Sequence, residues 1–356
     1  METVNPEHKK LRFTRTIRLD RGDPEAKRQE ILEYFNNTFT IYEKLFDVIN
    51  DKEAYYIKAE PLRHPLIFYY GHTATFFINK FMLGGYIKER INPKFESMFA
   101  VGVDEMDWDD LNDSHYDWPT VDEVREYRNK VRELVTKKIK EFPISIPITW
   151  ESPFWTVMMG IEHERIHLET SSVIIRRLPA DKVHDESLWP LCPETDFQGY
   201  DSEGNPRVNE NFPKNELLDV EEGTVSTGKN DGLYGWDNEY GEHVVKVPAF
   251  KASKFLVSNY DYLQFMLDGG YENQKWWTEE GWRWNRSTQM KRPLFWVPDQ
   301  VVNNKQTYKY RAFTKVIDMP WDWPVETNYL ESKAYCNWLA AKTGKSIRLP
   351  TEEEWY

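Results

Sequence analysis

The chain has 356 residues, a length at which two domains, each with its own core, are expected. Its formal net charge of -13, from 46 basic and 59 acidic residues, argues against nucleic acid as the main partner. Only Cys192 and Cys336 are present, which excludes a disulfide framework, and residues 1–12 lack the apolar core of a signal peptide, so a cytoplasmic protein is expected.

Residues 1–180 predict a four-helix bundle with a long second connection. The helices are expected over residues 23–50, 65–79, 120–142 and 153–178. Asp23 to Asn50 shows apolar residues at steps of three and four, Pro65 opens an uncharged and buried second helix, and Thr120 begins a capping box. A membrane span is a poor alternative for the second helix because Lys80 interrupts its apolar run.

The character of the chain changes after Pro179. Residues 181–217 are rich in Pro, Asp, Glu and Asn and are expected to form a connector. Residues 218–356 alternate short apolar runs with Gly, Asn and Trp clusters, which predicts a loop-dominated α+β domain packed largely by aromatic residues. Within it, one helix is expected from Asn328 to Thr343, with Gly344 as its stop.

The fourth helix carries two histidines, His163 and His167, one helical turn apart. Such a pair can converge on one metal ion, although it could also be a solvated face with Glu164 and Arg165 as salt-bridge partners. The buried second helix supplies His72 as a third candidate ligand, because helices of a bundle bring side chains together in the core. Three neutral imidazoles leave positions open for substrate or oxygen and suit iron(II) or zinc better than magnesium.

The same residues also satisfy the H-E-x-x-H pattern of zinc proteases, in which Glu164 would activate water. The longer metzincin pattern fails, since Thr170 and Val173 stand where its glycine and third histidine belong. A distant carboxylate such as Glu186 could still serve as the third ligand. A zinc-dependent hydrolase is therefore the alternative from the motif alone.

Longer motifs in both halves of the chain resemble known families. The first half resembles a DinB-like four-helix bundle with an H-x-x-x-H-x-E motif ending at Glu169. The second half resembles the formylglycine-generating-enzyme-like (sulfatase-modifying factor) domain, a C-type-lectin-like fold. Its landmarks are Glu222-Gly223-Thr224, Trp236-Asp237-Asn238-Glu239, Asp268-Gly269-Gly270-Tyr271, Gly281-Trp282-Arg283-Trp284 and Arg348-Leu349-Pro350-Thr351-Glu352. The pairing resembles that of the iron-dependent sulfoxide synthases of thiohistidine biosynthesis.

Within that family, three stretches resemble the ovothiol branch. They begin at Leu62, Met106 and His115 and read L-R-H-P-L-I-F-Y-Y-G-H, M-D-W-D-D-L and H-Y-D-W-P. The ergothioneine branch tends to carry glutamine before the second motif histidine, where this chain has Ile166. This departure favours unmethylated histidine as the acceptor, with an ergothioneine-type synthase as the alternative.

The resemblance implies that His72, His163 and His167 bind Fe(II), while Glu169 orients a ligand from outside the coordination sphere. It implies O2-dependent joining of L-cysteine sulfur to the imidazole C5 of L-histidine, giving 5-histidylcysteine sulfoxide. Oxygenation of cysteine sulfur alone is the competing outcome.

The resemblance leaves the catalytic residue and most substrate-binding residues unassigned. The chain ends at Tyr356, directly after an R-L-P-T-E-x-E-W motif that more of the domain follows in the family. The lectin-like domain is therefore expected to be incomplete, and the family's catalytic tyrosine is expected beyond Tyr356, so no catalytic residue is assigned. A fragment that binds metal without turnover is a third interpretation. Nothing resembles a methyltransferase cofactor loop. Arg90 and Arg125 are possible carboxylate partners for substrates, though each is more often a surface arginine. The other substrate-binding residues and the oligomeric state are not predicted.

Overall fold

The computed structural model describes residues 11, 14–100, 116–192 and 195–356, which form two compact units. The first unit comprises the chain up to Pro190 together with residues 230–239 and 313–315, and the second comprises the remainder. The predicted division into residues 1–180, 181–217 and 218–356 stays a prediction. The motifs beginning at Met106 and His115 fall partly or wholly outside the described residues.

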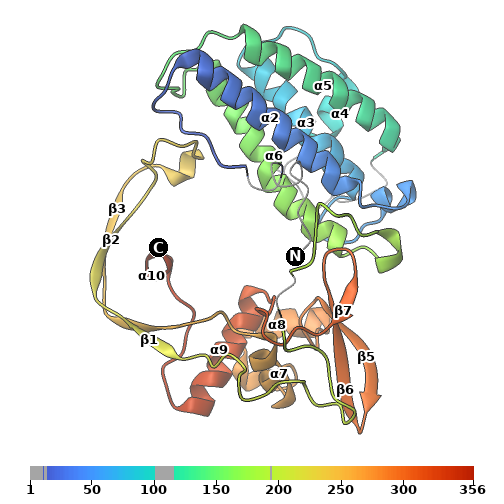
Figure 1. The fold of residues 1–356 in the computed structure, drawn as a ribbon, viewed down its shortest axis with the longest axis vertical. Coiled ribbons are helices and arrows are strands. Elements are labelled where there is room, and N and C mark those ends of the chain that lie inside the picture. Colours follow the sequence, from blue (N-terminus) through green and yellow to red (C-terminus); the bar gives the residue numbers. More distant parts are fainter. Residues whose placement is uncertain (1–10, 12–13, 101–115, 193–194) are drawn as a thin grey trace. The chain divides into compact units, whose positions relative to one another are not determined.

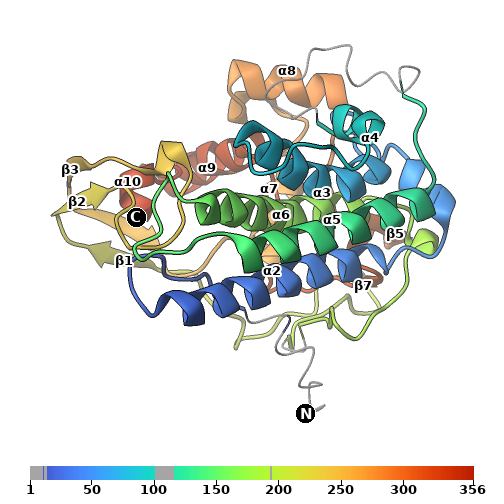
Figure 2. The same ribbon diagram turned by 90° about the horizontal axis from the view of Figure 1, so that it is seen from above.

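The first unit is a bundle of long helices that lie side by side (Figures 1 and 2). Its long helices are α2 (Pro24–Phe46), α3 (Leu66–Leu83), α5 (Val121–Glu141) and α6 (Pro153–Arg176). The short helix α4 (Pro93–Met98) packs on α3, and single turns of 3-10 helix occur at Lys52–Tyr56, Ala180–Lys182 and Asp237–Glu239. The predicted four-helix arrangement is confirmed within the described residues.

Local signals in the sequence explain where these helices begin. The side chain of Asp23 accepts a hydrogen bond from the first turn of α2, and Ser152 does the same for α6, which has proline at its first position. Thr120 and Glu123 form the predicted capping box of α5. The helix ends differ from the predicted ends by a few residues, since α3 continues past Asn79 to Leu83.

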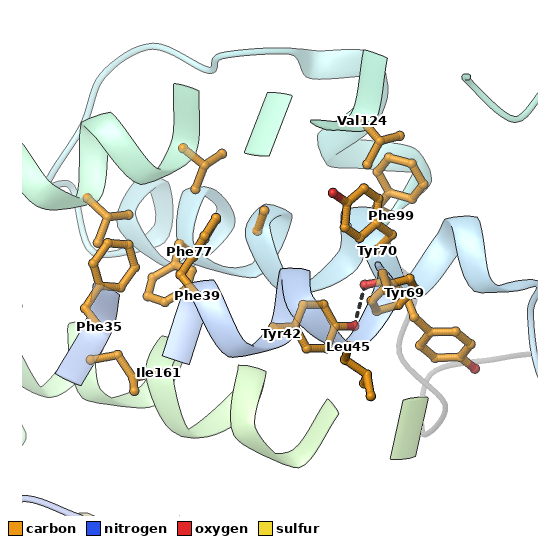
Figure 3. Packing of buried hydrophobic residues seen from close by; sticks show 14 of the residues in the cluster. Phe35, Phe39, Tyr42, Leu45, Tyr69, Tyr70, Phe77, Phe99, Val124 and Ile161 are labelled. Atoms are coloured by element: carbon orange, nitrogen blue, oxygen red, sulfur yellow. Dashed lines mark hydrogen bonds between the residues drawn. The ribbon is translucent and has the colours of Figure 1, made fainter. Parts of the chain in front are cut away.

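Aromatic side chains fill the interior of the bundle (Figure 3). Phe35 and Phe39 of α2 contact one another, and Phe35 meets Phe77 of α3 edge to face at 5.5 Å between ring centroids. The hydroxyl of Tyr42 donates to the carbonyl oxygen of Tyr69 at 2.9 Å, which satisfies the polar atom of a fully buried ring. The core therefore fixes α3 closely against its neighbours.

The second unit combines small antiparallel sheets with short helices. Strand β1 (Leu217–Val220) pairs with β4 (Phe250–Ser253), β2 (Gly223–Thr227) pairs with β3 (His243–Val247), and β5 (Trp296–Val302), β6 (Lys305–Arg311) and β7 (Val316–Asp318) form a three-stranded sheet. Its helices are α7 (Asn259–Leu267), α8 (Glu279–Thr288), α9 (Tyr329–Thr343) and α10 (Glu352–Trp355), with a 3-10 turn at Gln274–Trp276.

The interior of the second unit is aromatic, as its composition predicts. Trp296 and Trp321 are fully buried, and the indole nitrogen of Trp321 donates to the carbonyl oxygen of Gly199 at 2.6 Å. Helix α9 begins after Asn328 and ends at Gly344, whose φ of 67° is the left-handed conformation that favours glycine. In the part of the chain that the structure describes, no helix has the length and apolar character needed to cross a membrane.

Gly160 of α6 packs directly against the ring of Phe77 on α3. A Cβ atom at this position would lie 2.2 Å from Cε1 of Phe77, whose side chain is fully buried and cannot move aside freely. We expect Gly160→Ala to lower the free energy of unfolding by about 1–3 kcal/mol through overpacking, measured by urea denaturation. Thr170→Ala, at an exposed position of the same helix, is the matched control and should change stability little. Equal stability of the two variants would contradict this account of the α3–α6 contact.

Candidate metal centre

Three histidines from two helices converge in the bundle. His72 comes from α3, and His163 and His167 come from α6. One ring nitrogen from each lies within 4.8 Å of the others, and the ring centroids are 4.5–5.0 Å apart. The structure thus brings together the residues that the sequence predicts as ligands, and among the described residues it finds this one group of metal-binding type.

The orientation of His72 is fixed from outside the cluster. Its Nδ1 lies 2.6 Å from the carbonyl oxygen of Phe99, which follows the last turn of α4. A carbonyl oxygen can only accept, so Nδ1 carries the proton and Nε2 keeps the lone pair that a metal ion needs. This backbone partner was not predicted from the sequence. The sequence does indicate that a helix begins at Asn92-Pro93, and the end of that helix, α4, carries Phe99.

Aromatic rings from α3 border all three imidazoles. Phe76 stacks on His163 at 3.8 Å with an interplanar angle of 12°, and Phe68 stacks on His72 at 5.0 Å and 20°. Tyr69 lies 5.8 Å from His167. These contacts restrict rotation of the rings and give the cluster an apolar border.

Burial keeps the cluster neutral. Loss of hydration lowers the pKa of His72, lowers the pKa of His167 to about 3, and holds the pKa of His163 well below its ordinary value of 6.5, with the neighbouring imidazoles adding to the effect. The Nδ1 atoms of His163 and His167 are buried and have no hydrogen-bond partner among the described residues. Neutral imidazoles with unpartnered buried nitrogens fit a divalent metal ion, which accepts their lone pairs.

The two candidate carboxylates of the motif lie in different environments. Glu169 has an exposed side chain, so the predicted orienting role stays a prediction for it. Glu164 is fully buried, and its Oε1 accepts from Arg128 Nη2 at 2.8 Å and from Thr73 Oγ1 at 3.2 Å. Glu186 is not part of the histidine cluster found among the described residues.

The two candidate carboxylate-binding arginines already have acidic partners. Arg90 Nη1 donates to Asn79 Oδ1 at 2.6 Å and to the buried Glu96 at 3.1 Å, which braces the segment before α4 against α3. Arg125 has a half-exposed side chain that pairs with Asp122 at 3.5 Å. Neither arginine is part of the histidine cluster, so binding of a substrate carboxylate by either one stays a prediction.

Comparison with known families supports both halves of this description. Residues 34–171 match the DinB superfamily, and residues 203–356 match the sulfatase-modifying factor enzyme 1-like domain. The chain therefore has a helical bundle similar to the DinB superfamily, followed by a region similar to the sulfatase-modifying factor enzyme 1-like domain. The DinB match covers all three clustered histidines, and the predicted fold class is confirmed.

Curated relatives carry related names. Proteins named hercynine oxygenase from Mycolicibacterium thermoresistibile and Mycobacterium tuberculosis are each 38% identical, over 35% and 33% of this chain. Ergothioneine biosynthesis protein 1 of Schizosaccharomyces pombe is 25% identical over 85% of the chain. The alignments span 25% of each of the first two relatives and 38% of the third, so the chain matches about a quarter of the length of the hercynine oxygenases.

The neutral cluster predicts acid sensitivity of the metal-free protein. Histidines in the unfolded chain take up protons near pH 6.5, whereas buried His167 does so only near pH 3, so the unfolded state binds more protons as the pH falls through this window. We expect this histidine to lower the free energy of unfolding by about 2 kcal/mol in total between pH 7 and pH 5, measured by urea denaturation.

Two variants isolate that contribution. His167→Asn should show a shallower dependence on pH than the unaltered protein, and His184→Gln, which replaces an exposed histidine, should keep the original dependence. Identical pH profiles for His167→Asn and the unaltered protein would show that His167 is not held neutral by the fold.

Proposed function

We propose that the protein is a 5-histidylcysteine sulfoxide synthase that holds iron(II) with His72, His163 and His167. The observation that carries the proposal is the neutral three-histidine cluster inside a DinB-like bundle that is joined to a sulfatase-modifying-factor domain. The substrates proposed are L-cysteine, L-histidine and O2. The names of the relatives, an oxygenase and a biosynthetic protein, support oxidative chemistry on a histidine derivative.

The reaction balances without another reductant. The thiol hydrogen of cysteine and the C5 hydrogen of the imidazole leave, a carbon–sulfur bond forms, one atom of O2 is added to sulfur, and the other leaves as water. Iron(II), when bound, would supply the redox centre for this four-electron reduction of O2. Three neutral ligands leave coordination positions open, which suits two substrates that must be held together.

The residues of the chain would prepare this site before the substrates arrive. The carbonyl oxygen of Phe99 holds the proton of His72 on Nδ1 and directs Nε2 toward the cluster. Stacking by Phe76 keeps the ring of His163 in place, and the apolar border limits access of water.

A zinc-dependent hydrolase is less well supported because of Glu164. A hydrolase needs this carboxylate beside the open side of the metal as a base, but it is fully buried in an ion pair with Arg128. An ergothioneine-type synthase is the second candidate, favoured by the name hercynine oxygenase. Ile166 stands directly before His167, where the ergothioneine branch tends to carry glutamine, and this departure favours the unmethylated acceptor.

The proposal is tested by reconstituting the protein with iron(II) without oxygen and then adding O2, L-cysteine and an acceptor. We expect mass spectrometry to detect a histidine–cysteine adduct with one added oxygen, formed in preference to a hercynine adduct when both acceptors compete. His163→Ala should remove iron binding and the adduct, whereas His184→Ala, at an exposed position of the same unit, should retain both.

Other results would contradict the proposal in different ways. Preferential use of hercynine would assign the protein to the ergothioneine-type reaction. Tight zinc binding with hydrolytic activity that depends on Glu164 would support the hydrolase. Iron binding without any adduct would contradict the synthase assignment for this chain while leaving the metal site intact.

A further inference from the structure

Arg128 is a charged residue in the centre of the bundle, contributed by a helix that carries no candidate ligand. Its side chain is fully buried on α5. Nη1 donates to the carbonyl oxygen of Tyr70 at 3.0 Å and to Thr73 Oγ1 at 2.9 Å, and Nη2 donates to Glu164 Oε1 at 2.8 Å. One guanidinium group therefore bonds to both helices that carry the candidate ligands.

The bonded groups adjoin the histidines in the sequence. Tyr70 and Thr73 stand two residues before and one residue after His72 on α3, and Glu164 directly follows His163 on α6. Thr73 Oγ1 also donates to Glu164 Oε1 at 3.2 Å, which closes a triangle of hydrogen bonds between α3, α5 and α6. The triangle lies next to the ligand positions along both helices.

The guanidinium group is itself held in place by aromatic rings and a second acid. Its central carbon lies 4.2 Å from the centroid of the Phe39 ring and 5.1 Å from the centroids of Tyr42 and Tyr70. Nε is 3.4 Å from Glu43 Oε1 on α2. A guanidinium group is planar and its N–H donors point in fixed directions. Because this one is confined, the groups that it bonds to are held in a single arrangement.

Stability alone is a weak reason for such an arrangement. A buried ion pair is often replaced by apolar residues of similar volume without loss of stability, because desolvation of the two charges offsets their attraction. What apolar residues cannot reproduce is the directional set of bonds that ties α3 to α6.

We propose that Arg128, with Glu164 and Thr73, is a positioning residue of the metal centre: it sets the spacing of α3 and α6 and so the distances between the three histidine nitrogens. The inference rests on the proposed metal site. It assigns Glu164 a role in arranging the ligands and no role as a base.

Arg132 provides a matched control one helical turn further along α5. It bonds to Asn36 and to Thr40 Oγ1 at 2.8 Å, both on α2, and its guanidinium lies 5.4 Å from the Phe39 ring. Its Nη1 also pairs with Glu43 at 3.5 Å, and its side chain is partly exposed, whereas that of Arg128 is fully buried. It is therefore an arginine that shares Phe39 and Glu43 as neighbours with Arg128 but links α5 to a helix without candidate ligands.

The test is titration of the metal-free protein with cobalt(II), followed by its visible absorption, together with thermal unfolding of each metal-free variant. The double variant Arg128→Met/Glu164→Leu removes both charges and should remain folded. We expect its cobalt(II) affinity to fall about tenfold and its spectrum to change. Arg132→Met should keep the affinity of the unaltered protein within about twofold, even where its unfolding temperature falls.

Arg128→Lys keeps the positive charge but has a single nitrogen that cannot bond to Tyr70, Thr73 and Glu164 with the same geometry. We expect it to lose cobalt(II) affinity as well, so the inference is tested even if the double variant does not fold. Unchanged affinity and spectrum in either folded Arg128 variant, or an equal loss in Arg132→Met, would overturn the positioning role. Failure of the unaltered protein to bind cobalt(II) would instead overturn the proposed metal site.

Discussion

The packing of α3 against α6 is the contact on which the rest of the first unit depends. His72 lies on one of these helices and His163 and His167 on the other, so the cluster exists only at one separation and register of the pair. Gly160 allows the two backbones to approach, and Phe77 fills the space that a larger residue would occupy. The absence of charged residues from Leu66 to Asn79 of α3 follows from this position, because a segment buried on nearly all sides cannot hydrate charged groups. Lys80 falls in the last turn of the helix.

Three imidazoles placed this close together impose an electrostatic constraint. Protonation of one opposes protonation of the others, and burial disfavours every charged form, so the fold holds the cluster neutral with lone pairs available. Within the part of the chain that the structure describes, the buried Nδ1 atoms of His163 and His167 have no hydrogen-bond partner. Burying unpartnered nitrogens costs free energy that a divalent ion would recover, so binding of the proposed cofactor would be coupled thermodynamically to folding.

The sequence predicted the features that depend on local chemistry. The spacing of His163 and His167, the capping box at Thr120 and the stop at Gly344 were all predictable because each needs only neighbours within a turn or two. Features that depend on which distant residue a side chain contacts were not predictable. The carbonyl oxygen of Phe99 carries no residue-specific signal, and no pattern connects Arg128 to Glu164, since their contact exists only after three helices have packed.

Three consecutive residues of α6 show how the fold distinguishes between two functional interpretations of the H-E-x-x-H motif. Glu162 accepts from the hydroxyl of Tyr34 on α2 at 2.8 Å, His163 joins the cluster, and Glu164 pairs with Arg128 on α5. A helix turns about 100° per residue, so neighbours in sequence face different partners. In a zinc protease the glutamate of H-E-x-x-H must share the open side of the metal with water. Here its carboxylate pairs with a buried arginine, so this glutamate is not free to act as a base beside the cluster. That arrangement favours the proposed chemistry, in which the substrates themselves would bind beside the metal.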